Sequence, residues 1–280
     1  MPTPRVAAIH DLSGFGRCSL TVAIPVLSAM GVQCCPLPTA FLSTHTGGFT
    51  GYTFLDMTEE MAAAADHWRS LELRFAAVYS GFLGSERQIG LVRRFLRDFR
   101  REGTLAVVDP VMGDFGRIYD TYTPAMCRRM AELAGDADVI TPNLTEAALL
   151  LGIPYGELPR DEAGLRALTE KLGCPGKRSV ALTGVSLGEG LTGAMCYDAG
   201  RGRTLPVQTE RVDREFLGAG DVFASVLTGA LVRGDGFFDA ARQAADFVRL
   251  CAVRTAAEGT PLREGMDFEP LLGRLAAPEN

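Results

Sequence analysis

The sequence has no apolar run long enough to cross a bilayer. Its longest, Val222 to Val232, falls well short of the ~20 residues that a membrane-spanning helix needs and lies between Asp221 and Arg233. The first residues, "MPTPRVAAIHD", also lack the apolar core of a signal peptide. We therefore expect neither a membrane-embedded nor a secreted protein.

Ligands for zinc and pairs for disulfides are equally scarce. The three histidines, His10, His45 and His67, are widely separated, and none of the seven cysteines forms a Cys-x-x-Cys pair. An odd cysteine count and the adjacent Cys34 and Cys35 argue against a disulfide framework. We expect reduced cysteines in a cytoplasmic protein, and any metal should be held by oxygen ligands.

Excess positive charge is absent too. The formal net charge is −6 and the isoelectric point is about 5.2, which excludes general electrostatic attraction to nucleic acid. No repeat or Pro/Ser-rich linker divides the 280 residues, of which 47% are hydrophobic. This composition predicts a single domain over residues 1–280. Because the net charge is negative, any anionic ligand must be bound by groups gathered at one site.

Short apolar segments alternate with helical patterns along the chain. Strands are predicted at 5–10, 32–37, 75–80, 104–109, 138–141 and 179–184, and helices at 19–30, 58–71, 86–103, 123–133, 143–151, 161–172, 220–234 and 237–257. The early strands are apolar throughout, as expected for parallel strands covered on both faces. The pattern predicts an α/β fold with a doubly wound, mostly parallel sheet and helices on both faces. Segments 193–198 and 203–208 predict an antiparallel hairpin at one edge.

Unusual polar and small residues follow the predicted strands. In doubly wound sheets, ligands bind outside the carboxyl ends of the strands. The residues at those ends are Asp11, Thr46, Gly81, Asp109, Asn143 and Thr183. We expect the functional site there.

The segment "IHDLSGFGRCS" (9–19) imitates a dinucleotide-binding fingerprint through Gly14, Gly16 and Ser19. The third small residue is serine, and no acidic residue ends the second predicted strand. A tight strand-to-helix turn explains the glycines about as well, so NAD binding is disfavoured.

Two segments are candidates for a cation site. In "TPNLTEAALLLG" (141–152), Asn143 and Glu146 form the pattern of a helix capping box, but their oxygens also suit Mg²⁺ held through water. The two interpretations are compatible only in part, because a capping glutamate is already occupied. In "VVDPVMGD" (107–114), a turn explains the proline and glycine, whereas Asp109 and Asp114 indicate a cation.

The segment "GAGD", Gly218 to Asp221, precedes an apolar, small-residue helix. A helix start explains the carboxylate and at most one glycine. An anion hole explains all four residues, because glycines admit close approach and their N–H groups lie at the positive end of a helix dipole. Asp221 beside it suits a base that takes a hydroxyl proton during phosphoryl transfer.

These segments together resemble the ribokinase superfamily, and in detail its pyridoxal/pyridoxamine kinase family. The matching segments are "IHDLSGFGRCSLTVAIPVLSAMG" (9–31), "STHTGGFTGY" (43–52), "YSGFLGS" (79–85), "DPVMGD" (109–114), "TPNLTEA" (141–147), "ALTG" (181–184) and "FLGAGD" (216–221). The resemblance implies a ribokinase-like fold and ATP-dependent phosphorylation of the 5′-hydroxymethyl group of a B6 vitamer. It also implies Mg²⁺, a homodimer and, in some members, K⁺.

The resemblance implies that Asp221 deprotonates the vitamer hydroxyl. The amides of Gly218, Ala219 and Gly220 would stabilise the γ-phosphoryl charge. On the nucleotide side, Asp109, Asn143 and Glu146 would lie along the ATP phosphates and Mg²⁺, with Thr183 near the nucleotide and Tyr122 on a mobile flap at 115–124. On the vitamer side, Thr46 and Phe82 would lie at the pyridine ring.

Two residues depart from the family pattern. Ala219 stands where pyridoxal kinases have threonine, and Asp11 stands where many have a serine that touches the vitamer ring. Asp11 could pair with a protonated amine or ring nitrogen, which would favour pyridoxamine or an aminopyrimidine.

Three other functions are weighed against the vitamer kinase. Hydroxymethylpyrimidine kinase is the nearest, because its substrate is also an aromatic nitrogen ring with a hydroxymethyl arm. A non-catalytic vitamer-binding protein is less favoured, since Asp221 and the phosphate-side carboxylates are all present. An NAD oxidoreductase is weakened by the missing acidic residue.

Overall fold

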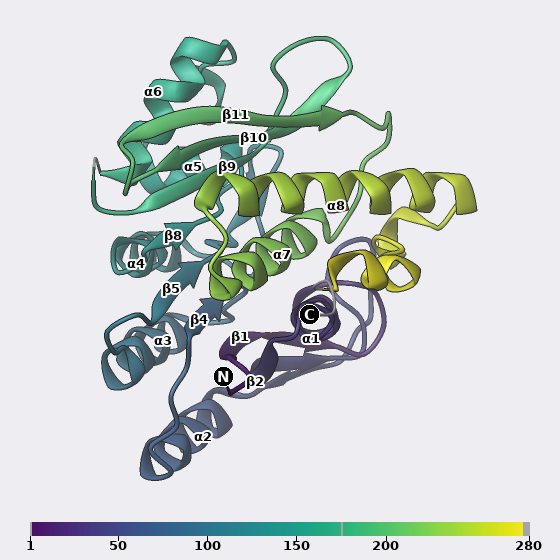
Figure 1. Ribbon diagram of the computed structural model, residues 1–280. Helices are drawn as coiled ribbons and strands as arrows, with labels where there is room; N and C mark the ends of the chain where they lie inside the picture. Colours follow the sequence, from purple (N-terminus) through teal and green to yellow (C-terminus); the bar gives the residue numbers. More distant parts are fainter. Residues whose placement is uncertain (1, 175, 277–280) are drawn as a thin grey trace.

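The computed structural model describes residues 2–174 and 176–276, and one large sheet organises them. Its strands run in the order β11-β10-β9-β8-β5-β4-β1-β2-β3 (Figure 1). They are β1 (Arg5–Ser13), β2 (Gln33–Leu42), β3 (Phe54–Asp56), β4 (Ala77–Ser80), β5 (Leu105–Val108), β8 (Val139–Ile140), β9 (Ser179–Val185), β10 (Leu191–Asp198) and β11 (Arg203–Glu210). The six inner strands β9, β8, β5, β4, β1 and β2 pair in parallel, while β3, β10 and β11 are antiparallel to their neighbours.

Helices cover both faces of this sheet. They are α1 (Ser19–Ala29), α2 (Thr58–Ser70), α3 (Glu86–Phe99), α4 (Pro124–Gly135), α5 (Leu144–Leu151), α6 (Glu162–Gly173), α7 (Ala219–Arg233) and α8 (Phe237–Glu258), with short 3₁₀ turns at Tyr155–Glu157, Leu262–Glu264 and Glu269–Leu275. Figure 1 shows α2, α3 and α4 on one face, with α1, α7 and α8 on the other. The predicted α/β architecture and its antiparallel edge hairpin are confirmed. No helix of the described residues is long and apolar enough to cross a membrane.

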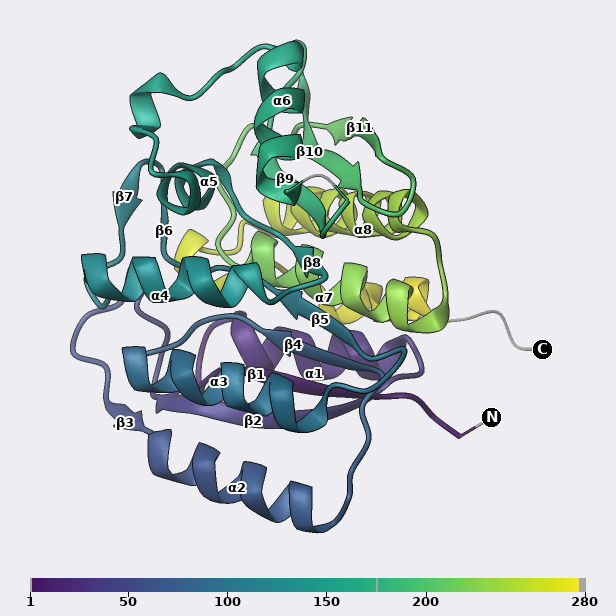
Figure 2. The same ribbon diagram turned by 90° about the vertical axis from the view of Figure 1, so that its left-hand side faces the viewer.

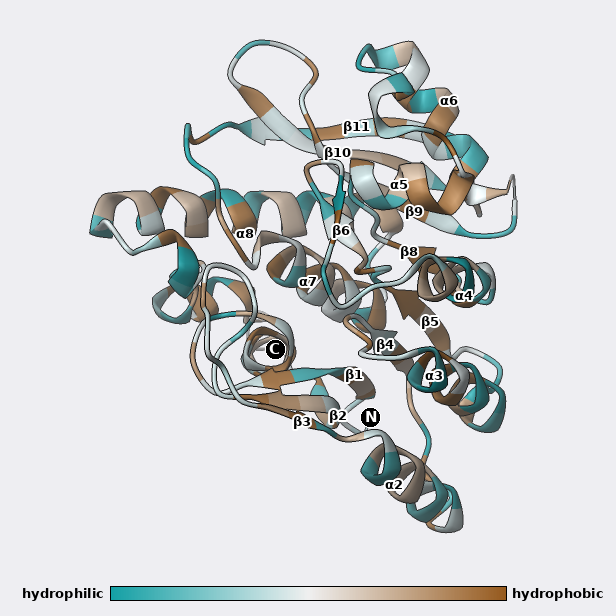
Figure 3. Cartoon of the chain, turned by 180° about the vertical axis from the view of Figure 1, so that it is seen from behind, coloured by the Kyte–Doolittle hydropathy of each residue, from teal (hydrophilic) through white to brown (hydrophobic). Residues whose placement is uncertain are grey.

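Two apolar clusters fill the space between sheet and helices, one on each face. Figure 3 shows hydrophobic residues along β5 and β8 and hydrophilic residues on the outer faces of α2, α3 and α4. Helix α3 is typical: its buried positions Ile89, Val92, Phe95 and Phe99 recur at helical spacing. Its first turn is capped by Ser85, whose side chain accepts a hydrogen bond from the Gln88 N–H.

A short hairpin of β6 (Gly113–Asp114) and β7 (Arg117–Ile118) stands apart from the main sheet. Figure 2 shows it beside α5, at one end of the sheet. Its turn and its second strand, β7, lie in the segment 115–124 that the sequence predicted as a flap, whereas β6 directly precedes that segment. The hairpin itself and the edge strand β3 were not predicted.

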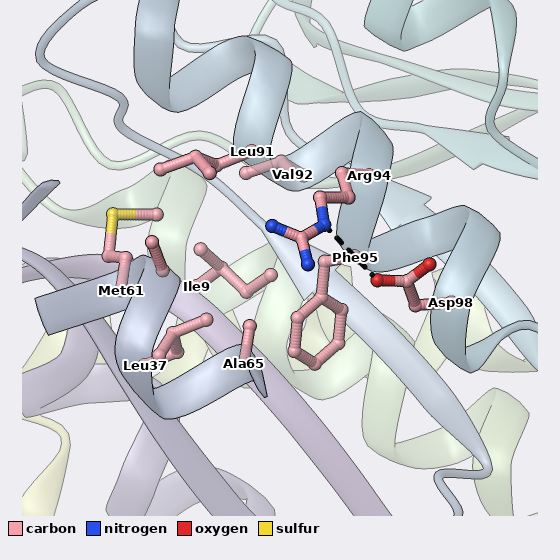
Figure 4. Close-up of a pocket in the computed structure, with 10 residues that line it drawn as sticks. Ile9, Leu37, Met61, Ala65, Leu91, Val92, Arg94, Phe95 and Asp98 are labelled. Atoms are coloured by element: carbon pink, nitrogen blue, oxygen red, sulfur yellow. Dashed lines mark ion pairs between the residues drawn. The ribbon is translucent and has the colours of Figure 1, made fainter. Parts of the chain in front are cut away.

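A small crevice opens between α2 and α3 (Figure 4). Ile9, Leu37, Met61 and Phe95 are among its lining residues, and an ion pair between Arg94 and Asp98 (3.4 Å) lies at its side. No residue predicted for the functional site lines it.

Phe95 gives a test of the packing on this face. Its ring stacks on Phe99 at 4.2 Å between centroids and is 2% exposed. Phe95→Ala should lower the free energy of unfolding by about 3–5 kcal/mol, because it deletes buried surface and enlarges the crevice. Urea denaturation measures the loss, and Leu71→Ala, at an exposed position, should change stability by less than about 0.5 kcal/mol.

Candidate active site

The first acidic side chain of the site follows β5. Asp109 is 7% exposed, and its Oδ1 accepts a hydrogen bond from the Thr141 hydroxyl at 2.9 Å. Thr141 follows the neighbouring strand β8, so two strand ends meet here, as the sequence predicted. Burial raises the pKa of the Asp109 carboxyl, which therefore sits in a site that favours a nearby positive charge.

Asn143 and Glu146 form the capping box that the sequence predicted for α5. The Asn143 side chain accepts from the Glu146 N–H (2.9 Å), and Glu146 accepts from the Asn143 N–H (2.8 Å). The other Glu146 oxygen accepts from the Met112 N–H (3.2 Å), and the Asn143 amide donates to the Gly113 carbonyl (2.9 Å). The pair therefore caps α5 and also fixes the start of the flap.

This arrangement fits a magnesium site that works through water. Burial and the negative charge of Asp109 raise the pKa of Glu146 well above its usual range, so the two carboxylates lie close enough to repel each other. Each carboxylate oxygen has lone pairs left after its hydrogen bonds. Within the described residues, no three side chains converge as a metal cage. Mg²⁺ usually takes one or two carboxylates together with waters and substrate phosphates. Asp109 and Glu146 can supply the carboxylates.

Thr183 lies beside the same loop. Its N–H donates to the Pro142 carbonyl at 2.8 Å, and its hydroxyl lies 3.4 Å from that oxygen. The end of β9 is thus held against the residue before Asn143. The structure thus brings Thr183 beside the loop that carries Asn143, on the nucleotide side predicted from the sequence.

The anion-hole segment opens α7 with an unusual backbone. Gly218 caps the helix with φ at +78°, and a Cβ there would lie 2.3 Å from the Arg17 carbonyl oxygen. A Cβ on Gly220 would meet nothing within 4 Å. The N–H groups of the first turn have no partner within the helix, so they are available to an anion.

Asp221 lies in that first turn and is half-buried. Burial raises its pKa to about 8, and the negative charges of Asp109 and Asp11 act in the same direction. A hydrogen bond from the backbone N–H of Ser19 lowers the pKa of Asp221 and so partly offsets these effects. Three predicted residues from different elements therefore share one electrostatic environment beside free N–H donors.

Asp11 lies near the end of β1, where its charge acts on Asp221. It is 5% exposed, and the Ser13 hydroxyl donates to its Oδ2 at 3.0 Å. Burial raises the pKa of Asp11, while the Ser19 and Ser13 hydroxyls lower it. No ion pair to Asp11 forms within the described residues.

Thr46 lies on a loop that His45 holds in place. His45 Nδ1 accepts from the Gly47 N–H (3.0 Å), so Nε2 carries the proton and donates to the Arg263 carbonyl (2.7 Å). The imidazole fits against Gly16, where a Cβ would come within 2.3 Å of the ring. Burial lowers the pKa of His45, which keeps it neutral. Thr46 itself is exposed.

Phe82 and Tyr122 lie together at the end of β4. Their ring centroids are 6.2 Å apart in an edge-to-face arrangement, with Phe82 half-buried and Tyr122 only 7% exposed. The structure thus packs Tyr122 into the apolar core under the flap instead of exposing it to a nucleotide. Its place over the phosphates stays a prediction.

Tyr119 is the flap tyrosine that faces the acidic residues. It follows β7, is 41% exposed, and its N–H donates to the Met112 carbonyl at 3.0 Å. Partial burial and the charges of Glu146, Asp114 and Asp221 raise the pKa of Tyr119, so its hydroxyl stays protonated. Tyr119 was not predicted, although it lies in the flap segment, three residues after Gly116.

Two more residues near Asp221 were missed. Ser19 begins α1 with φ at +49°, a strained value for a residue with a side chain. Cys18 lies close enough to Asp11 and Asp221 that their charges add to burial in raising the pKa of its thiol. Ser19 occurred in a recognised motif, but only as a small residue.

Comparison with known proteins decides the family. The model of the family described as phosphomethylpyrimidine kinase matches residues 22–263. The chain belongs to this family. The resemblance stated from the sequence is thereby confirmed at the family level, and Asp11, Asp109 and Asp221, which act on one another, lie in three of the matching segments.

Several members of the phosphomethylpyrimidine kinase family resemble the chain over most of its length. A Bacteroides thetaiotaomicron structure, described as a candidate phosphomethylpyrimidine kinase in a crystal form with pyridoxal, is 40% identical, covers 99% of this chain and 97% of its own, and has a TM-score of 0.92. Pyridoxal kinase from Lactobacillus plantarum is 30% identical, with 98% and 97% covered and a TM-score of 0.89. A hydroxymethylpyrimidine/phosphomethylpyrimidine kinase of Haemophilus influenzae is 31% identical over 205 residues, 71% of each chain.

Proposed function

We propose that this family member transfers the γ-phosphoryl group of ATP to the 5′-hydroxymethyl group of a B6 vitamer. The observation that carries the proposal is the position of Asp221, a half-buried carboxylate in the same helical turn as free N–H donors. A base and an anion hole side by side suit a step in which an alcohol loses its proton while charge develops on a phosphoryl group.

Asp221 acts as the base in this step. It takes the proton of the vitamer hydroxyl, whose oxygen then bonds to the γ-phosphorus as the bond to the β-phosphate oxygen breaks and ADP leaves. The raised pKa of Asp221, about 8, brings its proton affinity closer to that of an alcohol than an ordinary aspartate allows. The N–H groups at Gly218, Ala219 and Gly220 hold the migrating phosphoryl oxygens.

The nucleotide lies along the ends of β5, β8 and β9 in this proposal. Asp109, Asn143 and Glu146 hold Mg²⁺ through water, and Thr183 borders the nucleotide. Mg²⁺ supplies, when bound, the positive charge that offsets the triphosphate and these carboxylates. The raised pKa values of Asp109 and Glu146 support this, because such buried acids gain most from a nearby cation.

The ring of the vitamer lies between Phe82, Thr46 and Asp11 in this proposal. Asp11 is buried and forms no ion pair with a basic side chain in the described part of the chain, so a cationic ligand group would stabilise its charged form. Asp11→Asn should lower kcat/KM for pyridoxamine about tenfold or more relative to pyridoxal and pyridoxine, because a charge-assisted hydrogen bond is lost.

Steady-state kinetics with the three vitamers measures this preference. Ser13→Ala is the matched control: it removes a hydroxyl that supports Asp11 but keeps the charge, so the ranking of the vitamers should persist. Unchanged relative activities in Asp11→Asn would contradict a role of Asp11 in vitamer choice.

Hydroxymethylpyrimidine is the second candidate substrate. The Haemophilus influenzae relative supports it, and Asp11 suits an aminopyrimidine as well as a pyridoxamine. A coupled ADP-release assay with Mg·ATP, run with and without K⁺ against the three vitamers and hydroxymethylpyrimidine, tests both. ADP release with a B6 vitamer supports the proposal, and release with hydroxymethylpyrimidine alone supports the alternative. Vitamer binding without ADP release would indicate a non-catalytic binding protein.

A homodimer is the proposed assembly. Strand β3 is an edge strand, and Phe41, Phe54 and Leu55 along this edge are 42%, 45% and 59% exposed. Exposed edges with apolar side chains invite pairing with another chain. Light scattering of the protein and of Leu55→Glu tests the assembly, and a monomer in both would contradict it.

The seven cysteines are all unpaired, which supports a reducing, cytoplasmic setting.

A further inference from the structure

One buried hydrogen bond joins the sheet to the helix that carries Asp221. The Tyr79 hydroxyl, on β4, lies 3.4 Å from the Ser225 hydroxyl, on α7, and both residues are fully buried. Ser225 follows Asp221 by one helical turn, so the two side chains lie on the same side of α7. The contact therefore lies directly beneath the catalytic turn.

Within the described residues, this is the only hydrogen bond from α7 to the sheet. The hydroxyl of Thr228 bonds to the Ala224 carbonyl of its own helix, and Arg233 bonds to the C-terminal segment and to α8. The rest of the buried face of α7 is apolar or small. Apolar packing is not directional, so the Tyr79–Ser225 contact is the one directional link between α7 and the sheet among the described residues.

The ring of His10, on β1, contacts the ring of Tyr79. The ring centroids lie 4.3 Å apart at 70°, and neither His10 nitrogen has a hydrogen-bond partner among the described residues. Burial lowers the pKa of His10 to about 3, so the ring is neutral. A Cβ on Gly81 would lie 2.2 Å from His10 Nδ1, which shows how closely the strand ends enclose this ring. Tyr79 is thus held between β1 and α7.

We propose that Tyr79 and Ser225 are positioning residues that set the place of Asp221 relative to the transferring phosphoryl group. Tyr79 connects α7 to β4, and through His10 to β1, which carries Asp11 on the vitamer side. The base and the vitamer site are thereby held at a fixed separation. The proposal rests on the kinase function proposed above.

A misplacement of about 1 Å at a reacting group can cost as much as a hundredfold in rate. Tyr79→Phe keeps the ring and removes only the hydroxyl, and Ser225→Ala removes the other partner. Each variant should lower kcat by about tenfold to a hundredfold, with KM for ATP and for the vitamer within about twofold of the wild type. The double variant should be no slower than either single one, because both remove the same contact.

Thr228→Val is the matched control. It removes a buried hydroxyl of the same helix that bonds only within the helix, so it should leave kcat within about twofold of the wild type. Thermal melts of all variants separate loss of fold from loss of rate. Should Ser225→Ala fail to fold, Tyr79→Phe and Thr228→Val still make the comparison.

Three results would overturn the inference. The first is an unchanged kcat in Tyr79→Phe despite a lower Tm. The second is a raised KM at constant kcat in either variant. The third is a double variant whose loss of kcat is the sum, in free energy, of the losses in Tyr79→Phe and Ser225→Ala. An active wild-type enzyme with unaffected variants would refute the positioning role alone. A wild-type protein that transfers no phosphoryl group would refute the proposed function, and the positioning role with it.

Discussion

Replacing Asp221 with asparagine should lower kcat by about 10²–10⁴-fold, the usual contribution of a general base. Affinity for ATP should change little, because the N–H donors of α7 and the residues around Asp109 remain in place. Initial rates at saturating substrates measure the first effect, and calorimetric titration with ATP measures the second. A near-normal kcat would remove Asp221 from the catalytic role.

The same substitution should stabilise the fold at alkaline pH. In the unfolded chain the Asp221 carboxyl titrates at its ordinary value of 3.8, and in the folded protein its pKa is about 8. Between these values the folded state holds a proton that the unfolded state has lost. The contribution of Asp221 to stability therefore falls as pH rises from about 4 to 8. Asparagine does not titrate, so Asp221→Asn should melt above the wild type at pH 8 and approach it near pH 4.

Asp213→Asn is the control for both measurements. Asp213 precedes the anion-hole segment, and its side chain is 95% exposed. Its replacement should alter neither kcat nor the pH dependence of Tm. If the Tm difference between Asp221→Asn and the wild type were the same at every pH, the raised pKa of Asp221 would be wrong.

The sheet could be predicted from the sequence because burial on both faces demands apolar strands. The segments at 5–10, 104–109 and 179–184 contain or overlap β1, β5 and β9. Strand β3 could not be predicted in this way, because its three residues are all exposed and carry no burial pattern. The two-residue strands β6 and β7 are too short to show any period at all.

Part of the active site could likewise be predicted from the sequence. Asp11, Asp109 and Asp221 stand out in the sequence because carboxylates are costly beside apolar segments, and the structure brings all three together. The choice between Tyr119 and Tyr122 could not be made, since it depends on how the flap folds back. Tyr79 and Ser225 are 146 residues apart, and in the sequence each resembles an ordinary core residue, so their contact could not be predicted without the fold.

Gly218→Ala should damage both the fold and the rate. At φ of +78° an alanine costs about 1–2 kcal/mol, and its Cβ would press on the Arg17 carbonyl at 2.3 Å. Relief of that contact must move the first turn of α7, which carries the N–H donors. Loss of one such donor typically lowers kcat by about 10²–10³-fold. We therefore expect a lower Tm together with a kcat reduced by at least this factor.

Gly220→Ala separates these two effects. Its backbone is not left-handed, the added Cβ meets no atom within 4 Å, and alanine favours the helical conformation, so Tm should stay at or slightly above the wild-type value. In the proposed function a phosphate approaches the amides on this open side of Gly220, so the methyl group should still impair phosphoryl transfer. Thermal melts and saturation kinetics on both variants test the pair. Normal activity in Gly220→Ala would mean that no phosphate approaches there, because a Cβ in its path could not leave the rate unchanged.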